Sequence, residues 1–218
     1  ATEESDAPIV PNGLLLLDSG AHYDCGTTDI TRTISVGEPT EEERRVYTLV
    51  LKGHLQLQAM HFPEGTTGLQ LDTAARTAMW REGYDFGHGT GHGVGHVLGV
   101  HEGPAQIRKN FRMDTVKPIQ AGHVITDEPG IYVKGKFGVR IENCLLCVAA
   151  QETDFGRFLK FEPLTLCPYD RKLVVAEMLT CDERRWLNNY HERVKEVLMP
   201  LLASEQEKAW LENATLAI

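Results

Sequence analysis

The chain has 218 residues, of which 42% are hydrophobic and 24% charged, and its formal net charge is −9 at pH 7. This length is enough to bury a domain-sized core, and the composition is that of an ordinary globular protein. The acidic balance excludes a basic nucleic-acid footprint, and no apolar run approaches the roughly 20 residues of a membrane span. We expect no signal peptide, and the odd number of cysteines favours a reducing, cytoplasmic environment over a disulfide framework.

The first predicted element is a hairpin with an acidic residue in each arm. Leucines at 14–17 run into Asp18, and the turn at 24–26 leads into the β-branched segment 28–34, which contains Asp29. Apolar and β-branched runs on both sides of a turn predict two paired strands. We expect the two aspartates to face each other across the hairpin, where a buried carboxylate needs a partner.

Two helices are predicted after the hairpin. Thr40 and Glu43 have the spacing of a capping box, and apolar residues follow at helical intervals until Pro63, where we expect the helix to end. Residues 69–82 have a similar apolar pattern and stop at Gly83. The sequence therefore predicts an α+β fold.

Residues 86–104 contain four of the nine histidines, in alternation with glycine. Histidines four residues apart share a helix face, but each glycine in this segment costs a helix about 1 kcal/mol relative to alanine. We therefore expect extended or looped backbone that lets the imidazoles converge. A lone histidine is usually a surface or structural residue, whereas four together among glycines favour a metal or catalytic site.

A second hairpin is predicted over residues 124–146, with Glu128 on one arm and Glu142 on the other. It mirrors the first hairpin, which suggests a duplicated architecture, although the residues are too different to prove a repeat. Cys144 and Cys147 have the spacing of a zinc or redox motif. Residues three apart on a strand point to opposite faces, so core packing is the favoured interpretation.

The sequence changes character after Pro163. Residues 180–183 form another capping box before an amphipathic helix, and residues 204–207 begin a last short helix. We expect a main domain over residues 1–163 and a helical C-terminal extension over residues 164–218 that serves docking or oligomer contacts.

The predicted centre combines four acids with one histidine of the glycine-rich stretch. The acids are Asp18, Asp29, Glu128 and Glu142. Two unit charges about 4 Å apart repel by about 4 kcal/mol at an effective dielectric of about 20, so cations lie among these acids or some acids are protonated. Two divalent ions balance four carboxylates, whereas one ion leaves a negative surplus. Oxygen-rich ligation favours Mn²⁺, Co²⁺ or Fe²⁺ over structural zinc, and a metal pair that activates water indicates hydrolysis.

Five motifs in this order resemble the pita-bread metallopeptidases, the family of methionine aminopeptidase, prolidase and aminopeptidase P. They lie within residues 12–163 and read DSGAHYDCGTTDITRT, HGTGHGVG, VHEGP, TDEPGIY and GVRIEN. HGTGHGVG, VHEGP and the tail segments FEPLTL and WLNNYH look most like the longer form of aminopeptidase P. The resemblance implies a curved antiparallel sheet covered by helices, with a pseudo-twofold duplication, and makes residues 1–163 the catalytic domain.

The resemblance also implies the metal ligands, which are Asp18, Asp29, His92, Glu128 and Glu142. Asp18 resembles a bidentate ligand of one ion, and Asp29 and Glu142 resemble carboxylates that bridge two ions. A bridging hydroxide attacks the scissile carbonyl in this family, and Glu128 is the residue that handles its proton.

Further residues match positions around the ligands. His88 and His101 resemble residues that contact the substrate and stabilise the oxyanion. Arg140 resembles a residue that holds a ligand carboxylate in place. His96 matches no role, and Asp127 alternates to the other strand face from Glu128, which favours a structural role.

The implied activity is a metalloaminopeptidase that removes the residue before an N-terminal proline, with two Mn²⁺ ions favoured and Co²⁺, Fe²⁺ or Zn²⁺ as alternatives. Prolidase, which cuts Xaa-Pro dipeptides, and a non-catalytic binding protein of the same fold are the other interpretations. Family members carry further N-terminal domains, and their catalytic domain begins well before the first aspartate. We therefore expect an N-terminally truncated fold, peptide substrates with proline in second place, a homodimer, and neither nucleic acid nor membrane as partner.

Overall fold

The protein is a layered α+β structure in which every strand pair is antiparallel. The computed structural model describes residues 2–97, 99–111 and 116–218. The strands are β1 (Gly13–Tyr23), β2 (Gly26–Val36), β3 (His61–Pro63), β4 (Gly91–His92), β5 (Gln106–Ile107), β6 (Val124–Asp127), β7 (Gly130–Val133), β8 (Phe137–Arg140), β9 (Asn143–Thr153) and β10 (Gly156–Pro163). The α-helices are α1 (Glu41–Gln58), α2 (Gly68–Trp80), α3 (Cys181–Leu198) and α4 (Glu205–Ala214). The 3₁₀ helices are η1 (Glu3–Ser5), η2 (Arg171–Leu173), η3 (Ala176–Met178) and η4 (Met199–Leu201).

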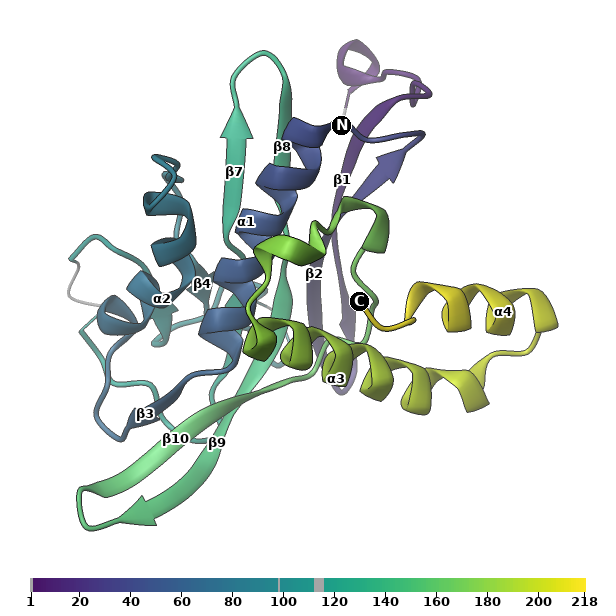
Figure 1. Cartoon of the computed structure of the whole chain (residues 1–218). Coiled ribbons are helices and arrows are strands. Elements are labelled where there is room, and N and C mark those ends of the chain that lie inside the picture. The colour runs from purple at the N-terminus through teal and green to yellow at the C-terminus, as the bar shows by residue number, and fades with distance from the viewer. Residues whose placement is uncertain (1, 98, 112–115) are drawn as a thin grey trace.

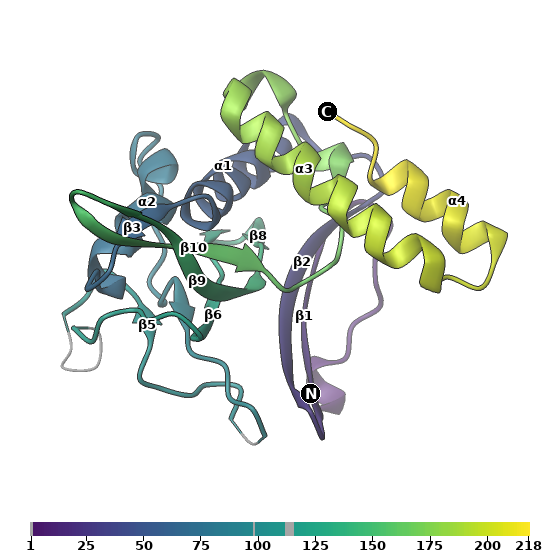
Figure 2. The same ribbon diagram turned by 90° about the horizontal axis from the view of Figure 1, so that it is seen from below.

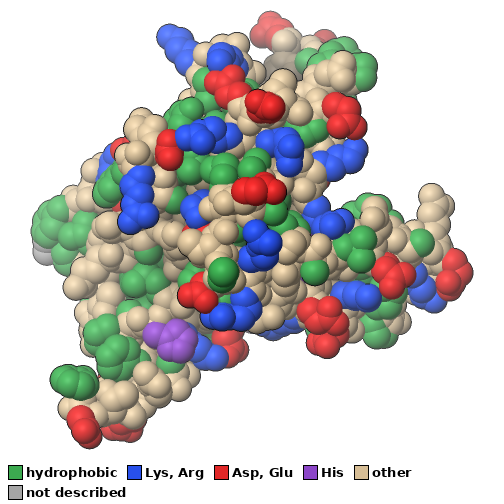
Figure 3. Space-filling view, in the orientation of Figure 1, with side chains coloured by type: hydrophobic (Ala, Val, Ile, Leu, Met, Phe, Trp, Pro, Cys, Tyr) green, Lys and Arg blue, Asp and Glu red, His purple; other side chains and the backbone are tan. Residues whose placement is uncertain are grey.

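The sheets occupy one side of the molecule and α1 and α3 lie side by side over them, as Figures 1 and 2 show. The largest sheet has the strand order β3-β10-β9-β6, and β1 pairs with β2 alone. None of the helices in the described ranges combines the length and the apolar character needed to cross a membrane. On the face drawn in Figure 3, acidic and basic side chains are interspersed.

The first hairpin forms as predicted, but its register differs from the expectation. Asp18 pairs with Thr31, and Asp29 pairs with Gly20, so the aspartates are diagonal neighbours and do not stand directly opposite each other. Paired residues, and residues two apart on a strand, share one face of the sheet. Both carboxylates therefore still point to the same side.

Helix α1 begins as its capping box predicts. The Thr40 hydroxyl accepts from the Glu43 N–H at 3.2 Å, and the Glu43 carboxylate accepts from the Thr40 N–H at 2.7 Å. The expected end at Pro63 is wrong, because α1 stops at Gln58. Pro63 instead lies in β3, where the chain pairs with β10.

The second hairpin also forms, but its pairing is interrupted halfway. The outer half pairs β6 with β9, and the inner half pairs β7 with β8. Glu128 and Glu142 occupy the interruption, one on each arm. The Glu142 N–H donates to the Thr31 carbonyl at 3.0 Å, which joins this hairpin to β2 of the first.

One hydrophobic cluster runs from α1 into the C-terminal part of the chain. It combines α1 residues such as Tyr47 and Leu51 with Leu173, Leu187 and Val194, all of them buried. A second cluster fills the space between α1, α2 and the sheet of β3, β10, β9 and β6. Residues 164–218 therefore share their main core with the preceding domain.

The cysteine pair of β9 behaves as predicted. Cys144 and Cys147 are both buried and both free. The Cys144 thiol donates to the Asp29 carbonyl at 3.2 Å, which packs β9 against β2. Core packing is thus confirmed for the pair.

Candidate metal centre

The five predicted ligands line one cavity of about 350 Å³. They come from three separate parts of the chain: the first hairpin gives Asp18 and Asp29, β4 gives His92, and the interruption of the second hairpin gives Glu128 and Glu142. The cavity lies where the two hairpins meet. The histidine-glycine stretch reaches it as extended backbone, because β4 pairs with β5, and residues 86–97 and 99–104 contain no helix.

Three of these residues form a compact donor cluster. Ligand atoms of Asp29, His92 and Glu142 all lie within 4.8 Å of one another. His92 Nε2 is 3.4 Å from Asp29 Oδ2 and 3.5 Å from Glu128 Oε1. His92 Nδ1 is 3.0 Å from the Gly93 carbonyl, which can only accept, so in the neutral ring Nε2 presents its lone pair to the acids.

The electrostatics of the cluster fit a cation site. Burial raises the pKa of Glu128 to about 7. Burial, and next the neighbouring carboxylate of Glu128, raise the pKa of Glu142 to about 8. Crowded carboxylates with little water, grouped around an imidazole lone pair, have the donor chemistry that divalent cations require.

Two threonine hydroxyls hold the glutamates. Thr31 Oγ1 donates to Glu142 Oε2 at 2.6 Å, and Thr126 Oγ1 donates to Glu128 Oε1 at 3.2 Å. Thr126 Oγ1 also accepts from the His92 N–H at 3.0 Å. Hydrogen bonds of this kind fix the direction in which a ligand presents its oxygens.

Arg140 lies against Asp18, as the resemblance implies. Its guanidinium pairs with the Asp18 carboxylate and donates to the Tyr132 hydroxyl at 2.9 Å and to Thr31 Oγ1 at 3.3 Å. The Asp18 side chain is 48% exposed. Arg140 therefore orients the most open carboxylate of the group.

The structure separates the two histidines expected to contact substrate. His101 lines the cavity, and its ring stands edge-on to His92 with 4.3 Å between ring centroids. His88 is not part of the cavity lining in the described chain. Its Nε2 is 2.9 Å from the Tyr132 hydroxyl, which connects it to Arg140.

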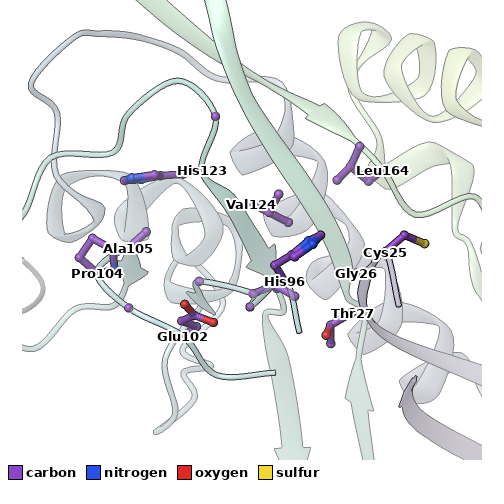
Figure 4. A pocket seen from close by; sticks show the side chains of 15 residues that line it. Cys25, Gly26, Thr27, His96, Glu102, Pro104, Ala105, His123, Val124 and Leu164 are labelled. Carbon is purple, nitrogen blue, oxygen red and sulfur yellow. The ribbon is translucent and has the colours of Figure 1, made fainter. Parts of the chain in front are cut away.

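His96 lies outside the donor cluster. It lines a neighbouring cavity of about 480 Å³ together with His123 and Glu102, and Cys25 and Leu164 stand on the opposite side (Figure 4).

Asp127 is fully buried beside His54 and also lies outside the lining of the metal cavity. The strand alternation predicted its position correctly.

Sequence reasoning missed a buried arginine that anchors the histidine-glycine stretch. Arg76, on α2, pairs with Asp72 at 2.6 Å and with Asp85 at 2.6 Å, and donates to the His88 carbonyl at 3.1 Å. Thr90 Oγ1 donates to Asp72 at 2.5 Å. The available signal was an aspartate and an arginine four residues apart on a helix whose other inward positions are apolar.

The fold and the centre agree with the comparisons. The chain matches the Metallopeptidase family M24 over residues 1–149, and the C-terminal region of peptidase M24 over residues 157–218. The protein belongs to metallopeptidase family M24, and its antiparallel sheets with covering helices are the pita-bread fold of that family.

Within this family, the chain is similar to proteins named as aminopeptidases P and as prolidases. Aminopeptidase P1 of Lotus japonicus is 46% identical over 215 residues, which is 97% of this chain and 32% of that protein. The X-prolyl aminopeptidase of Caenorhabditis elegans, described as a cytosolic enzyme with a di-nuclear active site, matches 100% of this chain and 36% of its own chain with a TM-score of 0.92 and 43% identity. The prolidase of Pyrococcus furiosus matches 72% of this chain and 43% of its own with a TM-score of 0.60 and 36% identity. The chain spans about a third of the length of the curated relatives it matches.

Proposed function

We propose that this chain carries the dimetal centre of an Xaa-Pro aminopeptidase, which hydrolyses the bond between an N-terminal residue and a following proline. The convergence of Asp29, His92 and Glu142 within 4.8 Å, with Asp18 and Glu128 in the same cavity, carries the proposal. A match over 100% of this chain to an X-prolyl aminopeptidase favours this activity over dipeptide cleavage. Matches over 72% of this chain do not separate the two activities, because they occur with both a prolidase and an X-Pro aminopeptidase.

Two divalent ions would be held by Asp18, Asp29, His92, Glu128 and Glu142. Four carboxylates and a neutral imidazole balance two doubly charged cations, and the excess of oxygen donors favours Mn²⁺, with Co²⁺, Fe²⁺ and Zn²⁺ as alternatives. When bound, such a pair supplies an acidified water and polarises the substrate carbonyl.

The remaining residues orient groups and move protons. Thr126 donates to Glu128 Oε1 and orients this carboxylate, which we assign to exchange a proton with the attacking water. His101, next to His92, is placed to donate to the developing oxyanion. His88 contacts the substrate further along the cleft, beside Tyr132. We also propose a cytoplasmic location, because free cysteines fit a reducing compartment. We further propose that the protein forms a homodimer.

A histidine substitution with a matched control tests the function. His92→Ala should remove both the bound metal and the cleavage of an Xaa-Pro-Xaa tripeptide, whereas His96→Ala, in the adjacent cavity, should preserve both. Glu128→Gln should abolish cleavage as well. Tripeptide cleavage that survives His92→Ala would refute the proposal.

Two further assays distinguish an Xaa-Pro aminopeptidase from a prolidase and from a non-catalytic binding protein. A preference for an Xaa-Pro dipeptide over the tripeptide would identify a prolidase. Folded wild-type chain that binds almost no Mn²⁺, Co²⁺, Fe²⁺ or Zn²⁺ would identify a non-catalytic binding protein.

A further inference from the structure

A layer of buried polar side chains lies behind the two glutamates, on the side away from the cavity. We call it the rear polar layer, and each of its members is at most 6% exposed. Its members come from β2, α1, both arms of the second hairpin and the segment after β10: Arg32, His54, Asp127, Asn143 and Tyr169.

Two members of the rear polar layer are chain neighbours of the proposed ligands. Asp127 precedes Glu128, and Asn143 follows Glu142. Asp127 and Asn143 are also cross-strand partners, at the last paired position before the hairpin is interrupted. The position of the Asp127–Asn143 pair therefore determines where the β6–β9 pairing ends, and with it the backbone positions of Glu128 and Glu142.

The Tyr169 hydroxyl connects the two sides of that pair. It accepts from Asn143 Nδ2 at 3.0 Å and lies 2.9 Å from His54 Nε2. His54 Nδ1 lies 3.2 Å from the Asp127 carbonyl and 3.1 Å from Asp127 Oδ2. One direction satisfies the hydrogen bonds: Asn143 donates to Tyr169, Tyr169 donates to His54, and His54 Nδ1 donates to the Asp127 carbonyl.

Arg32 fixes the other end of the layer. Its guanidinium donates to Asn143 Oδ1 and to the Glu142 carbonyl, both at 2.7 Å. The Tyr169 ring packs on the Arg32 guanidinium at 4.7 Å and on the Tyr190 ring at 4.8 Å. Buried polar groups without partners are costly, so the removal of one hydroxyl disturbs a connected set of neighbours.

We infer that Tyr169 is a positioning residue for Glu128 and Glu142, and that the segment after β10 is thereby a working part of the metal centre. This rests on the proposed function, because it concerns the same centre. Tyr169 touches neither ion nor substrate; it acts through Asn143 on one arm of the hairpin and through His54 and Asp127 on the other. Groups hydrogen-bonded directly to a ligand change metal affinity by about 10- to 100-fold when they are removed, and Tyr169, one residue further away, should act at the lower end of that range.

Tyr169→Phe removes the hydroxyl and keeps the ring. The matched control is Tyr47→Phe, because the Tyr47 hydroxyl is also fully buried and also bridges α1 to the C-terminal segment, accepting from the Asp170 N–H at 3.1 Å. Tyr47 belongs to the same hydrophobic cluster as Tyr169, but its hydroxyl makes no hydrogen bond to the rear polar layer in the described structure. Tyr169→Phe loses two buried hydrogen bonds and Tyr47→Phe loses one, so both should melt earlier than the wild type and Tyr169→Phe should melt earliest.

The measurement is a Co²⁺ titration of the purified chain, followed by the ligand-field absorption of the bound ion and paired with thermal melts. Tyr169→Phe should weaken Co²⁺ binding about tenfold and alter the spectrum, whereas Tyr47→Phe should leave both unchanged. Should Tyr169→Phe not fold, His54→Asn breaks the same link while keeping a donor towards Asp127, and should weaken binding equally.

Three outcomes would overturn the inference. Tyr169→Phe with wild-type affinity, or equal weakening in Tyr169→Phe and Tyr47→Phe, would leave Tyr169 a purely structural residue. Wild-type chain that does not bind Co²⁺ would instead reject the metal centre, and the inference with it.

Discussion

The two hairpins supply the same donor chemistry from different surroundings. In the first, β1 and β2 pair without interruption, and the Asp18 side chain at the open rim is 48% exposed. In the second, Glu128 and Glu142 sit where the ladder is broken, and Glu142 is only 2% exposed. The unbroken ladder therefore carries one carboxylate at its open rim and one, Asp29, that is 8% exposed, whereas the interruption of the second ladder lets the backbone turn Glu142 inward.

The inward arrangement needs more support than the open one, in which Asp18 pairs with the Arg140 guanidinium. A buried carboxylate must be paired or hydrogen-bonded, and the broken backbone beside it must be held in place. Thr31, Arg32 and the rear polar layer provide that support for the second hairpin. We therefore expect substitutions behind the second hairpin to reduce stability and metal affinity more than substitutions at the rim of the first hairpin.

The largest effect should follow removal of the arginine that ties the hairpins together. Arg32→Leu leaves the Glu142 carbonyl and Asn143 Oδ1 buried without their donor, so the free energy of unfolding should fall by at least about 3 kcal/mol. Arg45→Leu is the control, because Arg45 is half exposed and pairs only with Glu82. Urea denaturation gives both values, and a similar small loss in both variants would contradict the predicted role of Arg32.

Acid should destabilise the segment behind the second hairpin. Burial, and next the charges of Arg171 and Arg32, lower the pKa of His191 from 6.5 to about 4. The unfolded chain therefore binds the proton more readily, and stability that is complete above pH 6.5 is lost as the pH falls towards 4, by about 3 kcal/mol in all.

A histidine variant isolates this contribution. His191→Gln keeps an acceptor for the Tyr169 N–H, which His191 Nε2 accepts at 3.2 Å, but cannot take up the proton. Denaturation midpoints measured across this pH range should fall less steeply for His191→Gln than for the wild type. Parallel curves would exclude His191 as the source.

A smaller effect is expected from the hydroxyl that holds Glu142. Thr31→Val removes the 2.6 Å hydrogen bond to Glu142 Oε2 and should weaken divalent-ion binding about tenfold, or about 1.4 kcal/mol. Thr33→Val is matched, because Thr33 is equally buried on the same strand and donates to the Arg140 carbonyl. Calorimetric titration with Mn²⁺ compares them, and equal affinity in both variants would refute the role of Thr31.

The smallest effect should come from the exposed turn of the first hairpin. Cys25 lies at the tip and is exposed, so Cys25→Ser should change the free energy of unfolding by less than about 0.5 kcal/mol. Thermal melts of the two proteins should superimpose. A large shift would mean that the open hairpin is supported as closely as the buried one.

Local patterns predicted the parts of the fold that local forces decide. The capping boxes at Thr40 and Thr180 correctly begin α1 and α3, and the alternation of β6 correctly directs Asp127 away from the cavity. The family motifs, read in order, grouped the four acids with His92, and all five residues line one cavity. Each of these features depends on residues close together in sequence or on a recognised pattern.

Structural features that depend on residues far apart in the sequence could not be predicted from local patterns. The diagonal register of Asp18 and Asp29 depends on the position of the turn, which pairs Tyr23 with Gly26. The rear polar layer joins His54 to residues 73 and 115 positions away, and no local pattern marks such pairs. Pro63 joins a strand because β10, almost a hundred residues later, offers it an edge.

The central claim is that acids from the two hairpins surround a pair of cations. Crystals grown with Mn²⁺ and measured with anomalous scattering at the manganese edge test it most directly. Two anomalous peaks among Asp18, Asp29, His92, Glu128 and Glu142 are expected. Peaks elsewhere on the molecule, or none at these five residues, would contradict it.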